Sequence, residues 1–211
     1  MIGIITQARL GSTRLPKKIL KEVKGLSLLQ HQVNRLSKMN IPLFVATTTA
    51  PADELVEKYC EKKDIKVFRG SEQNVLERFY NCAKHFGLTT IIRITSDCPL
   101  IAPEIIQQGV VMFQENQQNN LYVSNLIKRT FPRGFDFEIF SFKLLERTYQ
   151  EATEDHEKEH VTPYIWEQNE KRGIKIMHVT GLEDNSKYRI TVDTDYDFKL
   201  IEKLILEHNA D

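Results

Sequence analysis

Near its start the chain carries the apolar run Ile2-Gly3-Ile4-Ile5, and three similar runs follow it at residues 43–46, 65–68 and 91–94. Short apolar runs rich in β-branched residues predict strands that are buried on both faces. The segments between them have apolar residues at helical spacing. Residues that favour helix starts precede or open three of these segments, namely Pro51, Asp53, Asn74 and Pro103. Strands that alternate with helices predict right-handed crossovers, and therefore an α/β fold with a mainly parallel mixed sheet flanked by helices.

The second half of the chain is less regular. It predicts strands at residues 121–125, 135–139, 174–179 and 188–192, and helices at residues 142–151, 156–168 and 195–208. No internal repeat, low-complexity tract or linker divides the sequence. We therefore predict a single domain over residues 1–211, in which an inserted region, approximately residues 121–180, binds substrate and contacts a second subunit.

Composition argues against several classes of function. The 211 residues include 29 Lys and Arg against 29 Asp and Glu, so net charge gives no drive toward nucleic acid or an anionic membrane. No apolar run approaches the roughly 20 residues that span a bilayer, and Arg9 brings charge too early for a signal peptide, so we expect a cytoplasmic protein without membrane insertion. The three cysteines are far apart and form neither a metal-ligand pair nor a disulfide framework.

A basic loop is predicted after the first strand, over residues 7–24. Its cations fall within sixteen positions and are opposed only by Glu22: Arg9, Arg14, Lys17, Lys18, Lys21 and Lys24. A triphosphate needs several cations and backbone N–H donors close together, and guanidinium groups bind phosphate through two hydrogen bonds. Gly11 permits close backbone approach and Pro16 stiffens the loop, although it lacks the Gly-Lys-Ser/Thr of a Walker A loop. We interpret it as a phosphate-binding loop; the alternative is a solvated basic loop.

Two aspartates end apolar strands of the predicted sheet. Asp97 follows the run at 91–94, and Asp193 ends the run at 188–192. Because ligands bind beyond the carboxyl ends of parallel strands, the basic loop, residues 47–50, residues 69–71 and Asp97 are expected on one rim. Carboxylates beside phosphates suit Mg²⁺, a hard cation that takes oxygen ligands. For either aspartate alone a turn or a helix cap is the simpler alternative, and Asp193 could cap the last helix.

The order of these motifs resembles one family. Gln7-Ala8-Arg9-Leu10-Gly11-Ser12-Thr13-Arg14-Leu15-Pro16, followed by Lys18, is similar to the N-terminal signature of the cytidylyltransferases that activate acidic sugars, such as CMP-Kdo and CMP-N-acylneuraminate synthetases. The spore coat polysaccharide biosynthesis protein F branch is the most similar group. Further motifs resemble that branch in order, over nearly the whole chain: Arg69-Gly70-Ser71-Glu72 with Arg78, Arg93-Ile94-Thr95 with Asp97-Cys98-Pro99, Tyr122-Val123-Ser124-Asn125, Phe131-Pro132-Arg133-Gly134 with Asp136 and Glu138, Glu159-His160-Val161-Thr162-Pro163-Tyr164, and Thr191-Val192-Asp193-Thr194.

The resemblance implies a GT-A-like nucleotide-binding fold and a reaction in which a sugar hydroxyl attacks CTP and releases pyrophosphate. Arg9, Arg14 and Lys18 would hold the triphosphate, and Mg²⁺ would lie on Asp97 and Asp193. The remaining nucleotide-binding residues implied are Ala8, Gly11, Ser12, Thr47, Thr48 and Ser71. The residues implied to face the sugar are Arg133, Asp136, Glu138, Glu159 and His160. A homodimer is expected, as in the relatives, and the second half is rich in Phe and Tyr.

Lys17 stands where the family often has glycine. A left-handed backbone would strain a lysine there, so either the loop has a different local shape or this position keeps a negative φ.

Other functions remain possible on the sequence. A glycosyltransferase with a nucleotide-sugar donor often has an Asp-x-Asp motif, and Asp193-Thr194-Asp195 has that spelling. A non-catalytic nucleotide-binding subunit is a second alternative. The choice of CTP over UTP and the identity of the sugar stay open. His156 and His160 lie four apart without a third ligand, so no histidine metal site is predicted.

Overall fold

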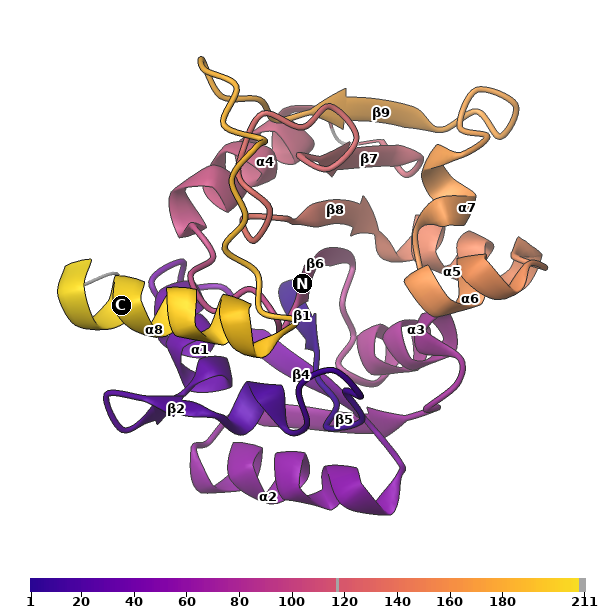
Figure 1. Ribbon diagram of the computed structural model, residues 1–211. Coiled ribbons are helices and arrows are strands. Elements are labelled where there is room, and N and C mark those ends of the chain that lie inside the picture. Colours follow the sequence, from indigo (N-terminus) through magenta and orange to yellow (C-terminus); the bar gives the residue numbers. More distant parts are fainter. Residues whose placement is uncertain (117, 209–211) are drawn as a thin grey trace.

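The structure is a computed structural model, and it describes residues 1–116 and 118–208. Within these residues seven strands form one mixed sheet in the order β5-β4-β1-β6-β8-β7-β9 (Figure 1). Their bounds are β1 Ile2–Gln7, β4 Leu43–Thr48, β5 Lys66–Gly70, β6 Thr90–Thr95, β7 Leu121–Ser124, β8 Glu138–Ser141 and β9 Lys175–His178. The first four in chain order are parallel, β8 runs antiparallel to β6 and β7, and β9 is parallel to β7. The mainly parallel mixed sheet that the sequence predicts is confirmed.

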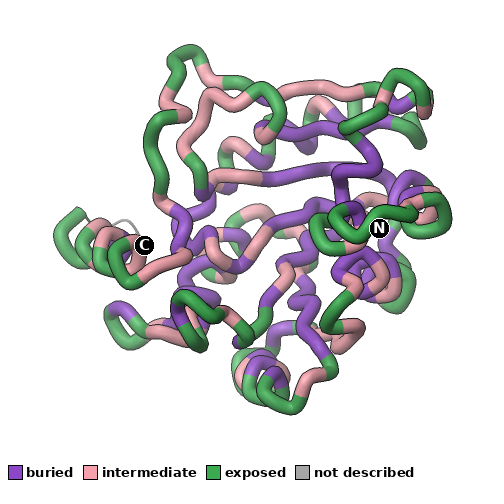
Figure 2. Tube along the Cα trace, turned by 45° about the vertical axis from the view of Figure 1, so that its right-hand side comes forward, coloured by how far each residue is buried: buried purple, intermediate pink, exposed green. Residues whose placement is uncertain are grey.

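Helices cover both faces of the sheet, which explains why the strands are apolar without alternation. Their bounds are α1 Leu28–Ser37, α2 Glu54–Lys62, α3 Val75–His85, α4 Pro103–Asn116, α5 Phe142–Glu151, α6 Asp155–His160, α7 Pro163–Trp166 and α8 Asp195–His208, with 3₁₀ turns η1 Lys18–Leu20 and η2 Pro51–Asp53. Ile5 packs with residues of α3 and α5, whereas its neighbour Ile4 packs on the opposite face with residues of α4. Figure 2 shows the buried strands between more exposed helices.

The basic loop after β1 is more ordered than predicted. It contains η1 and a short hairpin formed by β2 Glu22–Val23 and β3 Leu26–Ser27. The hairpin turn is Lys24-Gly25, and both residues have positive φ (50° and 71°), as a tight two-residue turn requires. Residues of α8 pack against this region through an apolar cluster that includes Leu15, Val23 and Ile201. The last helix therefore lies beside the first part of the chain.

Two predicted strands in the second half are wrong in extent or in type. Residues 135–137 are not in a strand, because the side chain of Asn125 accepts the Phe137 N–H (3.0 Å) and donates to the Phe135 carbonyl (2.8 Å). The strand begins only at Glu138, where β8 pairs with β6.

Residues 188–192 are not a strand beyond one bridge, between Arg133 and Arg189. This segment approaches Gly134 so closely that a Cβ there would lie 2.9 Å from the Ile190 carbonyl carbon. It then ends against the loop after β6, where the Val192 N–H donates to the Asp97 carbonyl (2.8 Å). Its apolar side chains pack on the α8 cluster rather than in the sheet.

The helix predicted over residues 156–168 is two helices. Val161 interrupts it with a φ of 72°, and Pro163 then opens α7. Cys60, Cys82 and Cys98 are free and buried. None of the helices in the described part of the chain is long and apolar enough to cross a bilayer.

Candidate functional site

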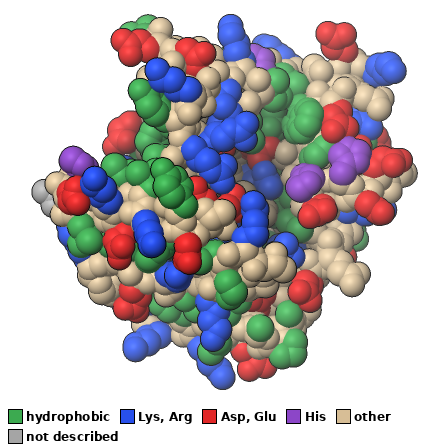
Figure 3. Space-filling model, in the orientation of Figure 1, with side chains coloured by type: hydrophobic (Ala, Val, Ile, Leu, Met, Phe, Trp, Pro, Cys, Tyr) green, Lys and Arg blue, Asp and Glu red, His purple; other side chains and the backbone are tan. Residues whose placement is uncertain are grey.

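A cavity of about 390 Å³ opens at the carboxyl ends of β1 and β6. Four segments form its walls: the basic loop from Gln7 to Lys18, residues 95–97 after β6, Val75 and Arg78 of α3, and Glu159 with His160 at the end of α6; Asp193 completes the lining. Figure 3 shows this hollow with Lys and Arg side chains around it and His side chains on one border. The position agrees with the rule that ligands bind beyond the carboxyl ends of parallel strands.

A buried carboxylate holds the first turn of the basic loop. Asp53 is 2% exposed and accepts the Leu10 N–H (2.7 Å) through Oδ1. Its other oxygen accepts the hydroxyl of Thr48 at the end of β4. The sequence predicted Asp53 only as a helix-start residue, whereas the structure ties it to the loop. Thr48 and its buried neighbour Thr47 do not line the cavity, and Thr48 instead orients Asp53.

Lys17 has a left-handed backbone, with φ 54° and ψ 26°. Of the two alternatives that the sequence left open for Lys17, the negative φ is therefore wrong. The residue is the N-cap of η1, and the Leu20 N–H donates to its carbonyl (2.9 Å). The conformation is one that glycine adopts without strain and lysine does not, so the loop keeps its shape at some energetic cost.

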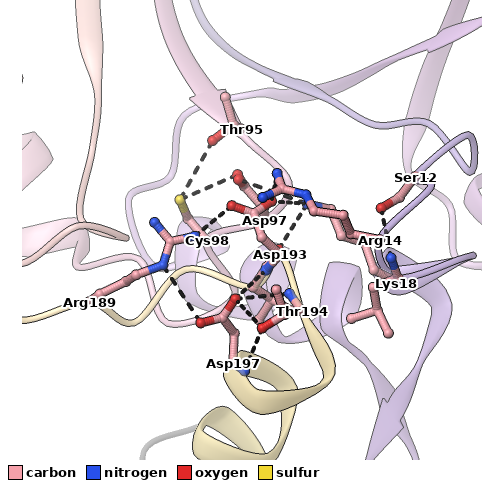
Figure 4. Close-up of polar contacts among 12 residues, drawn as sticks. Ser12, Arg14, Lys18, Thr95, Asp97, Cys98, Arg189, Asp193, Thr194 and Asp197 are labelled. Carbon is pink, nitrogen blue, oxygen red and sulfur yellow. Dashed lines mark hydrogen bonds and ion pairs between the residues drawn. The ribbon is translucent and has the colours of Figure 1, made fainter.

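The ammonium group of Lys18 lies between the two predicted metal-binding aspartates (Figure 4). Its Nζ is 2.9 Å from Asp193 Oδ1, 4.0 Å from Asp97 Oδ2 and 2.8 Å from the Val192 carbonyl oxygen. One cation thus reaches carboxylates from both halves of the chain. The same pair of carboxylates can share a divalent cation, and Mg²⁺ is commonly held by one or two carboxylates together with substrate phosphates. The described residues hold no cluster of three or more metal-ligating side chains.

Asp193 does not cap the last helix. Thr194 and Asp197 form that cap, because Thr194 Oγ1 accepts the Asp197 N–H (3.2 Å) and Asp197 Oδ2 accepts the Thr194 N–H (2.9 Å). Asp193 instead pairs with Lys18, with Arg189 (2.5 Å) and with Arg14 (3.6 Å). Burial alone would raise the pKa of Asp193, but the hydrogen bond and charge of Lys18, with the two arginines, outweigh it and hold the pKa below its ordinary value. The carboxylate is therefore charged at neutral pH.

Cys98 contributes no charge beside Asp97. Its Sγ donates to Asp97 Oδ1 at 3.6 Å, and it is buried. Burial first, and then the Asp97 charge, raise the pKa of the thiol well above its usual value. The negative charge at this edge of the cavity therefore comes from the two aspartates.

The family profile described as Cytidylyltransferase matches residues 2–211. The chain belongs to the cytidylyltransferase family. The resemblance to this family that the sequence motifs indicated is therefore confirmed.

Individual relatives agree with this assignment. The spore coat polysaccharide biosynthesis protein SpsF of Bacillus subtilis is 32% identical over 210 residues, covering 96% of this chain and 85% of that protein. The structure of a cytidylyltransferase from Leptospira borgpetersenii is 37% identical, with a TM-score of 0.91 over 97% of this chain and 86% of that chain. The structure of CMP:2-keto-3-deoxy-manno-octonic acid synthetase complexed with CTP is 16% identical, with a TM-score of 0.70 over 98% of this chain and 99% of that chain, and shares the fold.

This cytidylyltransferase brings most of its predicted nucleotide-binding and metal-binding residues together. Those that line the cavity are Ala8, Arg9, Gly11, Ser12, Arg14, Lys18, Asp97 and Asp193. Ser71 does not line the cavity, and its Oγ accepts the Asn74 N–H (3.0 Å) at the start of α3.

Only part of the predicted sugar-binding set reaches the cavity. Glu159 and His160 line it. Arg133 is exposed outside the lining, and Asp136 pairs with Arg129 (2.5 Å). Glu138 is 2% exposed and does not line the cavity, and its carboxylate accepts hydrogen bonds from Arg93, Tyr122 and Thr162.

Arg78 is a cavity residue that the sequence did not assign a role. It is 2% exposed and lies on the buried side of α3, where its guanidinium donates to the Ser71 carbonyl and its Nε has no hydrogen-bond partner among the described residues. Burial, with a smaller contribution from Arg9, lowers its pKa to about 10. The signal in the sequence that could have identified it is the position of an arginine on the same helix face as the buried Val75 and Phe79. Gln7, Thr95 and Ser96 also line the cavity without having been predicted.

Proposed function

We propose that this chain transfers CMP from CTP to the hydroxyl of a sugar, most suitably an acidic sugar, with release of pyrophosphate, in the cytoplasm and for a surface polysaccharide or glycan. The observation that carries the proposal is the position of Lys18 between Asp97 and Asp193, at a cavity lined by the basic loop. Membership of the cytidylyltransferase family supports the reaction class. The polysaccharide role follows the name of the Bacillus relative.

The basic loop would bind the triphosphate. Arg9 and Arg14 are exposed at the cavity, and Arg9 makes no ion pair with any described residue, so its guanidinium is available for phosphate. In the reaction the sugar oxygen forms a bond to the α-phosphorus, and the bond from that phosphorus to the bridging oxygen breaks. Negative charge builds on the leaving pyrophosphate, where the loop cations can stabilise it without rearrangement. The proton of the hydroxyl leaves to solvent or to a nearby base.

Mg²⁺ would be held by Asp97 and Asp193. The donor set fits, because both carboxylates already surround one cationic group and both are oxygen ligands. When bound, the ion would neutralise phosphate charge and lower the pKa of a hydroxyl near it. Lys18 would then pair with a phosphate in place of one carboxylate.

The choice of CTP has support from the CTP complex of the synthetase that shares this fold. Glu159 and His160 line the cavity at the end of α6, which makes them the residues best placed to contact the sugar. The glycosyltransferase alternative has little support from the site, because Asp195 is exposed, pairs with Lys21 and does not line the cavity. The Asp193-Thr194-Asp195 motif therefore does not bring two carboxylates together at the cavity.

A pyrophosphate-release screen tests the proposal. Four nucleoside triphosphates would be combined with a panel of acidic and neutral sugars in the presence of MgCl₂. We expect release with CTP and one class of sugar, together with a thermal shift that is larger for CTP than for ATP or GTP. Ligand at about 100 times its Kd stabilises a fold by about 2.7 kcal/mol, which a melting curve resolves. Equal shifts with all four nucleotides, and no pyrophosphate with any sugar, would contradict the proposal.

A further inference from the structure

One wall of the cavity depends on a strained turn. α6 ends at His160, and the next residue, Val161, has φ 72° and ψ −51°. The Thr162 N–H donates to the His160 carbonyl (2.9 Å), so residues 160–162 form a three-residue turn around a β-branched residue. This backbone conformation is unfavourable for any L residue with a Cβ, and such strain persists only where surrounding structure enforces it. Glu159 and His160, which line the cavity, directly precede it.

Two sets of contacts enforce the turn. The side chain of Val161 is fully buried in the cluster that also contains Phe79, Tyr164 and Ile165. On the other side of the turn, the Thr162 hydroxyl donates to Glu138 Oε1 (2.5 Å). The hydrophobic contacts fix the position of the Val161 side chain, and the hydrogen bond to Glu138 fixes the position of Thr162, the residue after it.

Glu138 is itself held rigidly. Oε1 also accepts the Tyr122 hydroxyl (2.6 Å), and Oε2 pairs with the Arg93 guanidinium. Arg93 reaches further, because its second nitrogen donates to Gln7 Oε1 (3.2 Å), and Gln7 lines the cavity at the end of β1. A buried carboxylate thus connects the β1 wall of the cavity to the α6 wall. Glu138 itself does not line the cavity.

We propose that Glu138 is a positioning residue, which acts through Thr162 and the turn at Val161 to hold His160 and Glu159 toward the sugar. This rests on the proposed function, since the sugar is assigned to the α6 wall. It gives Glu138 a different role from direct sugar binding. Losing the Thr162 hydroxyl would let the turn relax, and the end of α6 would move away from the cavity while the basic loop keeps its shape.

The test uses Thr162→Val, which removes the hydroxyl and keeps the volume. Thr162→Ser restores the hydroxyl, and Thr148→Val is the matched control. Thr148 is also buried, but its hydroxyl donates to the Leu144 carbonyl (2.8 Å) within α5. We expect Thr162→Val to lower kcat/KM for the sugar by about ten- to a hundredfold, mainly through kcat, because small misplacements of contact groups have effects of that size. The Kd for CTP should change by less than about twofold, and Thr162→Ser and Thr148→Val should stay within about threefold of the wild type.

A second readout does not depend on turnover. Hydrogen–deuterium exchange across residues 159–164 should be faster in Thr162→Val than in the wild type and in Thr162→Ser. Unchanged exchange and unchanged sugar kinetics in Thr162→Val would overturn the proposal. Equal losses in Thr162→Val and Thr148→Val would also overturn it, because they would indicate general destabilisation. If the wild type releases no pyrophosphate with any sugar, the proposed function has failed, and the exchange experiment alone decides whether Glu138 holds the turn.

Discussion

Two carboxylates from opposite halves of the chain meet one lysine at the mouth of the cavity. Replacing either Asp97 or Asp193 with Asn keeps the size of the side chain and removes the charge that a hard cation requires. We expect each variant to lose turnover by about 10² or more, the scale found when one preorganised charge-stabilising group is removed from a site. Pyrophosphate release across a Mg²⁺ titration measures the effect, with circular dichroism to check the fold.

Asp195→Asn is the matched control for these variants. Asp195 lies two residues beyond Asp193, is exposed and pairs only with Lys21 among the described residues. Its substitution should leave turnover and Mg²⁺ dependence near those of the wild type. Wild-type rates in Asp193→Asn would remove that residue from the proposed metal site.

Lys17 offers a test of backbone strain at a single residue. A left-handed backbone costs about 1–2 kcal/mol for a residue with a Cβ. Glycine would remove that strain but lose about 0.5–1 kcal/mol through the greater entropy of the unfolded chain. We therefore expect Lys17→Gly to raise the free energy of unfolding by about 0.5–1 kcal/mol, measured by denaturant titration.

The control for Lys17→Gly is Lys63→Gly. Lys63 is an exposed lysine that follows α2, and its φ is −104°, so glycine there relieves no strain and should lower stability. Equal effects of the two substitutions would show that the lysine side chain, rather than the backbone, matters at position 17.

Much of the site could be predicted from the order of residues, because parallel strands bring their carboxyl ends to one rim. This placed Arg9, Arg14, Lys18 and Asp97 correctly around the cavity. The other site residues were harder, because their roles come from partners distant in sequence. Asp53 binds a loop 43 residues earlier in the chain, and only the folded structure brings these groups together.

At the scale of elements, the start of α8 stabilises the segment that carries Asp193. Burial would raise the pKa of Asp197, but the N–H groups of Asp193 and Thr194, the Thr194 hydroxyl and the charge of Arg189 hold it below the ordinary value. A carboxyl whose folded pKa is depressed adds stability at a pH above its unfolded pKa of about 3.9 and loses it as the pH falls through the folded pKa. We expect Asp197→Asn to be about 1 kcal/mol less stable than the wild type at pH 7.

This difference in unfolding free energy should shrink as the pH falls below about 4, because the wild-type carboxyl becomes protonated. Denaturant titrations between pH 7 and pH 3 measure it. Asp195→Asn, which changes an exposed carboxylate at the start of the same helix, should show a small difference at every pH. If the difference in unfolding free energy between Asp197→Asn and the wild type were the same at every pH, the proposed role of the Asp197 charge would be contradicted.

The sequence predicted elements well where one physical signal dominated. The strands of the first half are short apolar runs, and they form β1, β4, β5 and β6. Residues 188–192, in which apolar and polar side chains alternate, also predicted a strand, yet their apolar side chains pack against α8 instead of in a sheet. The alternation and apolar content of a segment indicate that its side chains are buried. They do not indicate which element the segment packs against. The break at Val161 was missed because a turn with positive φ is expected at glycine, and a valine gives no local signal for it.

At the scale of the whole molecule, the region over residues 121–180 carries several exposed apolar side chains. Ile127, Tyr149 and Trp166 are each more than one third exposed. Apolar side chains at the surface often mark a subunit contact when they gather in a patch. We expect a homodimer at micromolar concentration, which light scattering would detect as a species of twice the 24.6 kDa mass of the chain. A single 24.6 kDa species at all concentrations would contradict this prediction.

The pairing of Lys18 with Asp193 has a consequence for biosynthesis. These two residues are 175 positions apart, so the lysine leaves the ribosome well before its carboxylate partner exists. At about 5–20 residues per second the interval is roughly 9–35 s. During that time the sheet can assemble from the emerging chain while its cationic loop still lacks the last wall of the pocket. The contact between the two residues therefore forms only after Asp193 has been made, when the segment before α8 packs against the basic loop.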